Sequence, residues 1–123
     1  MKDSLIYDKA FKFAVKIVEL YKDLVEKNKE YVLSKQLLRS GTSIGANIRE
    51  GLEGQSKKDF IAKLSIALQE ACETEYWIKL LTATGYLSKD VANTLLCEVT
   101  EIIKILNSIL RTSRNNLINK KKT

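Results

Sequence analysis

The sequence predicts an all-α fold, an antiparallel up-down-up-down four-helix bundle that assembles as a homo-oligomer. The 123 residues include no proline, so nothing in the chain interrupts a long helix. Apolar residues recur at alternating spacings of three and four, the period of a helix that packs on one side. Short connections between such segments make neighbouring helices run in opposite directions. We expect a four-helix bundle domain over residues 1–113 and a basic, frayed tail over 114–123.

The first helix is expected over residues 4–27, with a core-facing seam of alternating four- and three-residue spacing. That seam comprises Ile6, Ala10, Phe13, Ile17, Leu20 and Leu24. A second apolar stripe, formed by Phe11, Val15, Val18 and Val25, widens the apolar surface beyond half of the helix. A monomeric bundle does not need this second stripe, so we predict that it contacts another subunit.

The second helix is expected to end near residue 53 and to carry two glycines, Gly41 and Gly45, on its apolar face. Each glycine costs a helix about 1 kcal/mol relative to alanine. Close packing against a neighbouring backbone would compensate for that cost, and we assign both glycines to such a contact. The other members of this face are Leu33, Leu37, Ile44, Ile48 and Leu52.

The third helix is expected over residues 57–84, after Gly54 as a C-terminal cap and a capping box formed by Ser56 and Asp59. Its core face comprises Phe60, Leu64, Ala67, Leu68, Ala71 and Ile78. Ile66 and Trp77 lie on nearly the opposite side of this helix, and we assign them to the oligomer interface. If the preceding turn centres near residues 54 and 55, Arg39 lies level with Glu70, which predicts a structural ion pair.

The fourth helix is expected to begin after Ser88, and its core face comprises Val91, Leu95, Val99, Ile102, Leu106, Ile109 and Leu110. Most of the formal net charge of +6 lies at the C-terminal end of the chain, because residues 101–123 hold six Lys or Arg against one Glu. Flexible cations can neutralise phosphates without a defined fold. The candidate nucleic-acid-binding residues are Arg111, Arg114, Lys120, Lys121 and Lys122, although a solvated tail would account for them equally well.

The residues give no support to catalysis or to a bound cofactor. Residues 41–45 match the G-x-S-x-G pattern of hydrolases, but that site needs a preceding strand and a histidine base, and the chain has no histidine. Glutamates on the second and third helices lack the Glu-x-x-His pairs of di-metal bundles. We therefore expect no enzyme, no metal and no cofactor.

Cys72 and Cys97 lack the close spacing of metal or redox sites, and we interpret them as reduced thiols in the core. Charged residues recur every few positions in the first 17 residues, so neither a signal peptide nor a membrane span is expected. The expected location is the cytoplasm.

The string from Gln36 to Gly51, QLLRSGTSIGANIREG, resembles the four-helix-bundle proteins encoded in bacterial 23S rRNA intervening sequences. Residues 56–61, 67–71 and 73–77 extend the resemblance over nearly the whole chain. It implies a ring-like homopentamer. Relatives include the accessory variability determinants of diversity-generating retroelements, basic pentamers that bind a reverse transcriptase and nucleic acid. One departure lies at residues 52–55, where many relatives carry arginine and this chain does not.

Two functions remain open at this stage. In the first, a homo-oligomer associates with nucleic acid, RNA in preference to DNA, because repeated subunits add their basic surfaces. In the second, the protein is a structural adaptor for a protein partner such as a reverse transcriptase, without direct contact to nucleic acid.

Overall fold

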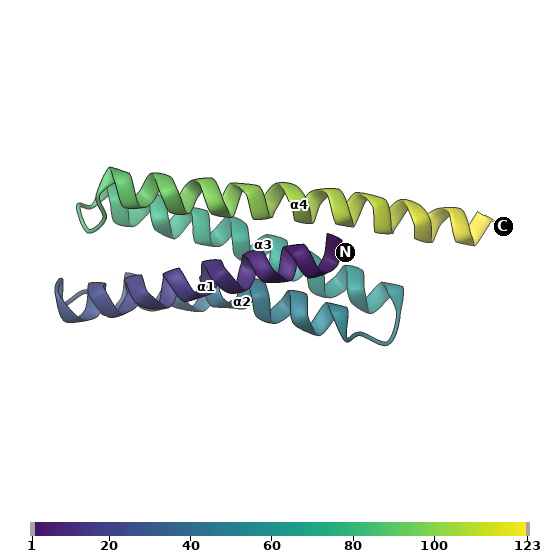
Figure 1. The fold of residues 1–123 in the computed structure, drawn as a ribbon, viewed down its shortest axis with the longest axis horizontal. Helices are drawn as coiled ribbons and strands as arrows, with labels where there is room; N and C mark the ends of the chain where they lie inside the picture. Colours follow the sequence, from purple (N-terminus) through teal and green to yellow (C-terminus); the bar gives the residue numbers. More distant parts are fainter. Residues whose placement is uncertain (1, 123) are drawn as a thin grey trace.

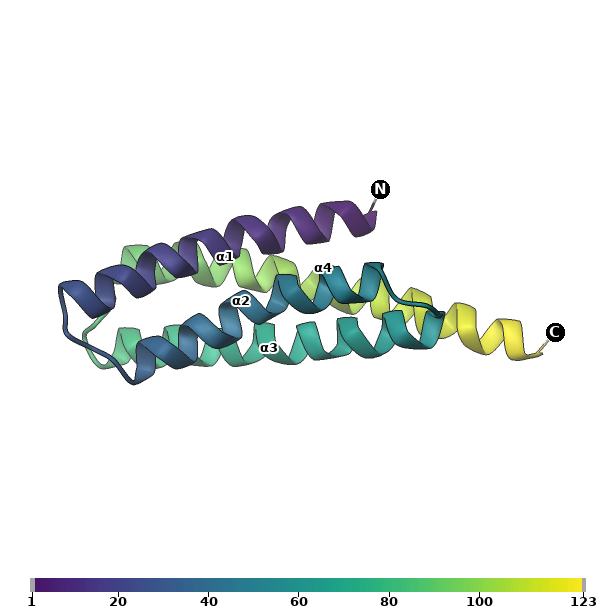
Figure 2. The same ribbon diagram turned by 90° about the horizontal axis from the view of Figure 1, so that it is seen from below.

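Four helices make up the described part of the chain, which in this computed structural model spans residues 2–122, with side chains over 5–119. They are α1 (Lys2–Glu26), α2 (Leu33–Leu52), α3 (Lys57–Ala83) and α4 (Lys89–Lys122). The helices lie side by side along one long axis (Figure 1). The α1–α2 and α3–α4 connections share one end, and the α2–α3 connection lies at the other (Figure 2). The all-α prediction is confirmed within this range.

Each helix packs against two of the others. α2 and α4 both contact α1 and α3, whereas α1 does not contact α3 and α2 does not contact α4 within the described residues. α1 and α3 therefore occupy diagonal positions, and their solvent-facing sides point in different directions. The α1–α4 contact is the smallest of the four.

The core runs through the bundle along the predicted seams. On α1, Ile6, Phe13 and Ile17 are fully buried, and Leu24 is nearly so. α4 contributes a continuous buried stripe from Leu95 to Leu110. Two predicted core positions are wrong, because Leu52 and Val91 lie near helix ends and are 38% and 45% exposed. Burial of these apolar seams supplies most of the favourable free energy of folding.

The helix ends follow from local sequence. The predicted cap of α3 is confirmed, since the backbone N–H of Asp59 donates to the Ser56 hydroxyl at 3.1 Å. At the end of α3, Gly85 adopts a left-handed φ of +88°, and the backbone N–H of Tyr86 donates to the carbonyl of Leu81. This is a Schellman ending, in which glycine avoids the steric cost of positive φ. Glu53, rather than Gly54, is the C-cap of α2.

Small residues bring α2 close to its neighbours. Gly41 and Gly45 are buried, and both face α1. Toward α3, the Thr74 and Ser40 hydroxyl oxygens lie 2.9 Å apart, and both residues are fully buried. The run Ser40–Ala46 is therefore helical because small side chains allow close contact on both sides, as the two glycines indicated.

Two further expectations differ from the structure. Cys72 and Cys97 are unpaired as expected, but both are exposed, so their assignment to the core is wrong. Each follows or precedes a core position by one or two residues, which turns its side chain outward on a helix. The helical backbone of α4 continues to Lys122, through the segment expected to fray.

No helix in the described range has the length and apolar character needed to cross a membrane.

Candidate functional site

Exposed basic residues of two helices lie at the end that holds the α2–α3 connection, beside the carboxylates of Glu50, Glu53 and Asp59. Lys57 and Lys58 open α3 there, and Arg111 and Arg114 lie on the adjacent stretch of α4; all four are exposed. The N-terminus of a helix adds partial positive charge at the same place. Arg114 donates to the Ser65 hydroxyl at 2.9 Å, which anchors its guanidinium to α3. Arg111 forms no ion pair within the described residues.

Two parts of the chain thus supply this basic end, although the sequence pointed only to the second. Lys57 and Lys58 stand far from Arg111 in sequence, and the α2–α3 turn brings the start of α3 beside this stretch of α4, where Lys57 shares a cavity with Thr112 and Ser113. The side chains of Lys120, Lys121 and Lys122, which complete the predicted set, lie outside the described residues.

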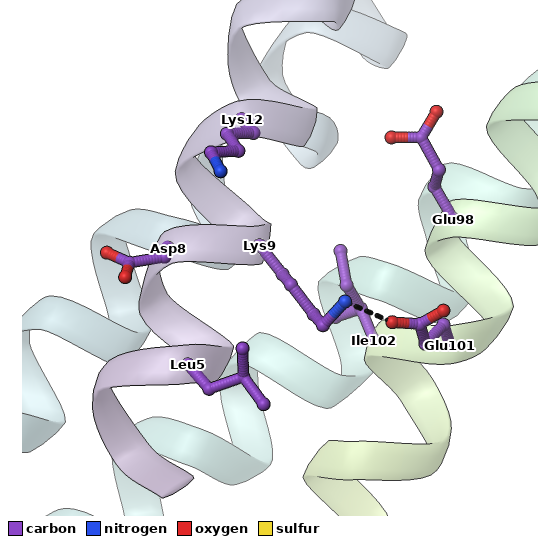
Figure 3. A pocket seen from close by; sticks show the side chains of 7 residues that line it. All are labelled: Leu5, Asp8, Lys9, Lys12, Glu98, Glu101 and Ile102. Atoms are coloured by element: carbon purple, nitrogen blue, oxygen red, sulfur yellow. Dashed lines mark ion pairs between the residues drawn. The ribbon is translucent and has the colours of Figure 1, made fainter. Parts of the chain in front are cut away.

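A pocket of about 300 Å³ lies between α1 and α4 (Figure 3). Lys9 reaches across from α1 to form an ion pair with Glu101, and Lys16 pairs with Glu98 at 2.7 Å two turns further along. Asp8 points away from α4 in this view. These ion pairs join α1 to α4 along their narrow contact, so the groove is a charge-balanced seam. No three His, Cys, Asp or Glu side chains among the described residues are grouped to hold a metal ion.

The residues predicted for the oligomer interface differ in how exposed their side chains are. Phe11 and Val15 on α1 are 56% and 44% exposed, and Ile66 on α3 is 38% exposed. Val18 and Trp77 are half-buried. The Phe11 ring packs against Tyr7, whose ring in turn lies 5.6 Å from the guanidinium carbon of Arg49. The structure therefore places apolar side chains on the outer sides of both diagonal helices.

Arg39 on α2 and Glu70 on α3 lie together, as their level in the bundle suggested. The guanidinium donates to the Glu70 carboxylate at 3.1 Å and also pairs with Glu73. The Trp77 indole N–H donates to Glu73 at 2.9 Å, so one carboxylate holds both the arginine and the tryptophan. This network links α2 to α3 and orients Trp77, and the Glu73 contribution was not anticipated from the sequence.

Glu30 is a further residue whose role the sequence did not indicate. It precedes α2, is 8% exposed, and accepts backbone N–H hydrogen bonds from Val32, Leu33 and Ser34 at 3.1, 2.9 and 2.7 Å. Burial opposes ionisation of this carboxyl, but these hydrogen bonds together with that of the Ser34 side chain outweigh it and lower its pKa. Glu30 thus replaces the missing side-chain cap of Val32 and places a negative charge at the positive end of α2.

An all-helical bundle with a basic end and apolar outer faces defines the class of this molecule. The chain belongs to the family of 23S rRNA-intervening sequence proteins, whose pattern matches residues 2–108. It is similar to the crystal structure of a protein of unknown function from the S23 ribosomal protein family of Bacteroides thetaiotaomicron. That protein is 56% identical, the alignment covers 90% of this chain and 99% of the other, and the TM-score is 0.89. None of the curated proteins compared with the chain matches it.

Proposed function

We propose that this protein is a non-enzymatic homo-oligomer of antiparallel four-helix subunits that associates with RNA through its basic end. The observation that carries the proposal is that Lys57 and Lys58 open α3 beside the stretch of α4 that holds Arg111 and Arg114, because Lys57 shares a cavity with Thr112 and Ser113. The family is named after intervening sequences of 23S rRNA, which is consistent with RNA as the negatively charged partner. Cations held on a fixed scaffold attract phosphate, and the attraction falls with salt.

Oligomerisation is supported by the placement of apolar side chains on diagonal helices. The outer side of α1 carries Phe11 and Val15, and the outer side of α3 carries Ile66 and Tyr76, all of which are exposed in the single chain. Joining two different faces of a subunit gives a head-to-tail contact, which closes into a ring when the rotation allows. In a homopentamer the subunit charge of +6 would sum to roughly +30.

A first experiment combines solution mass with RNA binding. The intact protein is measured by light scattering, and its affinity for a structured RNA and a length-matched DNA duplex is measured at two salt concentrations. The double variant Arg111→Ser/Arg114→Ser should weaken RNA binding at least tenfold. It should also make the fall of affinity with salt less steep, by the equivalent of about two phosphate contacts for each subunit that contacts RNA. The control is Lys22→Ser/Lys89→Ser, which removes the same charge from exposed positions at the other end.

The adaptor function is the second candidate. Tyr31 and Val32, in the α1–α2 connection, are 54% and 70% exposed at the end opposite the basic residues. Such exposed apolar side chains favour contact with a protein. A well-formed oligomer that binds no RNA even at low salt would contradict the RNA proposal and favour the adaptor. Equal RNA affinity in the Arg111→Ser/Arg114→Ser variant and its control would contradict the assignment to the basic end.

A further inference from the structure

A cavity of about 410 Å³ lies where the α2–α3 connection meets α4. That volume falls within the range of about 300–1,000 Å³ typical of small-molecule sites. One wall comes from the end of α2 and the start of α3, with Gly51, Leu52, Gly54, Lys57 and Phe60. The other comes from α4, with Ile109, Thr112, Ser113 and Asn116. No carboxylate is among these described lining residues, in contrast to the α1–α4 groove.

Ser113 is the unusual member of this lining. It is only 5% exposed, yet its hydroxyl makes no hydrogen bond within the described residues. The other buried hydroxyls, those of Ser34, Ser40 and Thr74, lie within hydrogen-bonding distance of oxygen acceptors. No completely enclosed side-chain N or O atom in this part of the chain lacks a partner, so the Ser113 hydroxyl keeps an opening, and the cavity that it lines provides one. Water or a ligand in the cavity can therefore supply the hydrogen bond that this hydroxyl lacks within the protein.

The groups around Ser113 supply three complementary kinds of contact. Asn116 follows Ser113 by three residues, which places the amide on the same side of α4, and it too makes no hydrogen bond within the described residues. An amide and a hydroxyl both donate and accept, as recognition of a polar ring edge requires. The half-buried Phe60 ring offers an apolar surface for a planar group. The Lys57 ammonium lies over that ring, 5.7 Å from its centre, in a cation–π contact. Because Lys57 is exposed and lysine has a long flexible side chain, the ammonium can leave the ring face and carry its positive charge to the edge of the cavity.

We propose that this cavity binds one unpaired nucleotide of an RNA. The base replaces the Lys57 ammonium on the Phe60 ring, and its hydrogen-bonding edge meets Asn116 and Ser113. The displaced Lys57 ammonium meets the phosphate of the same nucleotide. Proteins recognise single-stranded RNA in this way, by combining stacking, edge hydrogen bonds and a neighbouring cation. The inference rests on the proposed RNA association and specifies its contact: an unpaired nucleotide held at the basic end, beside Arg111 and Arg114.

The test measures binding of the four ribonucleoside monophosphates, and of inorganic phosphate, to the intact protein by calorimetry. Saturable binding of at least one nucleotide is expected, with affinity reduced at least tenfold in Asn116→Ala and in Ser113→Ala. The matched control is Asn115→Ala, because Asn115 is an exposed asparagine next to Asn116 that does not line the cavity. The Asn115→Ala variant should bind nucleotides as the wild type does. Ser113→Ala should also leave the melting temperature unchanged or raised, which separates lost binding from lost folding.

Three results would overturn the nucleotide site. These are no binding of any nucleotide, phosphate binding as tight as nucleotide binding, or affinities in Asn116→Ala and Ser113→Ala equal to that of Asn115→Ala. None of them would remove RNA binding that depends on Arg111 and Arg114, so failure of this inference is distinguishable from failure of the proposed function. Loss of RNA binding in Arg111→Ser/Arg114→Ser with mononucleotide binding retained would support the cavity as a separate contact.

Discussion

Gly41 on α2 and Ile17 on α1 lie so close that no side chain fits between them. A Cβ placed on Gly41 would approach Cγ1 and Cγ2 of Ile17 to 2.9 Å, shorter than real Cβ contacts. Ile17 is branched at Cβ and fully buried, so its side chain has little freedom to move away. The same Cβ on Gly45, one turn later, would lie 3.6 Å from Cβ of Ala10, an ordinary van der Waals contact.

The substitution Gly41→Ala should therefore destabilise the protein, by about 1–3 kcal/mol, because it overpacks the α1–α2 contact. Gly45→Ala is the matched control, and it should be neutral or stabilising by up to about 1 kcal/mol through the higher helix propensity of alanine. Urea unfolding of both variants measures the difference. Equal effects in the two variants would show that the contact with Ile17 does not require glycine at residue 41.

The close packing of these glycines could be predicted from sequence because glycine in a helix needs a compensating contact. The core seams could be predicted because apolar residues recur every three or four positions along a whole helix. That repeat places a residue such as Phe13 or Ile102 on the buried face of its helix. For a single residue next to such a seam, the sequence is a weaker guide to whether its side chain is exposed. Cys72 directly follows the buried Ala71, and its apolar character alone suggested burial, whereas its position on α3 turns it toward solvent.

The candidate site was only partly accessible to sequence analysis. Arg111 and Arg114 stand out because they lie in a basic segment, but the contributions of Lys57 and of Ser113 depend on which elements meet at the α2–α3 turn. Glu30 was missed because its carboxylate caps α2 from outside the usual N-cap position, which Val32 occupies. A glutamate two to four residues before the first free N–H groups of a helix is the signal that could have indicated it.

The Arg39→Ala substitution should lower the free energy of unfolding by about 0.5–1 kcal/mol at low salt. An exposed ion pair contributes little by itself, and Arg39 forms two of them, with Glu70 and Glu73. The loss should shrink in 0.5 M salt as screening increases, at a Debye length of roughly 4–5 Å. Lys79→Ala is the control, because among the described residues Lys79 pairs with Glu75 alone, at 3.5 Å within one helix. Urea unfolding at both salt concentrations checks the prediction, and a salt-independent loss for Arg39→Ala would contradict the ion-pair explanation.

The buried hydroxyls of Ser40 and Thr74 should be energetically coupled. Their oxygens lie 2.9 Å apart, but the Thr74 hydroxyl also lies 2.7 Å from the Glu70 carbonyl. Because that carbonyl remains available as an acceptor, Ser40→Ala alone should cost only about 0.5–1 kcal/mol. A double-mutant cycle with Thr74→Val, followed by thermal unfolding, should give a coupling energy of roughly 0.5 kcal/mol or more. Strict additivity of the two substitutions would show that the hydroxyls do not interact.

Glu30 should make the stability of the protein depend on pH in the acidic range. Its pKa in the folded protein lies below the usual value of 4.5, because the hydrogen bonds from the start of α2 favour the carboxylate despite burial. The stabilisation is therefore fully present above about pH 4.5 and is lost as the pH falls through the lowered pKa. Glu30→Gln keeps the shape but removes the charge, so it should cost about 0.5–2 kcal/mol at pH 7 and flatten the decline toward pH 3. Glu26→Gln, at an exposed position without an ion pair in the described structure, should change the unfolding free energy by less than about 0.5 kcal/mol. Urea unfolding from pH 3 to 7 measures all three proteins, and a decline in Glu30→Gln as steep as in the wild type would show that the acid sensitivity arises elsewhere.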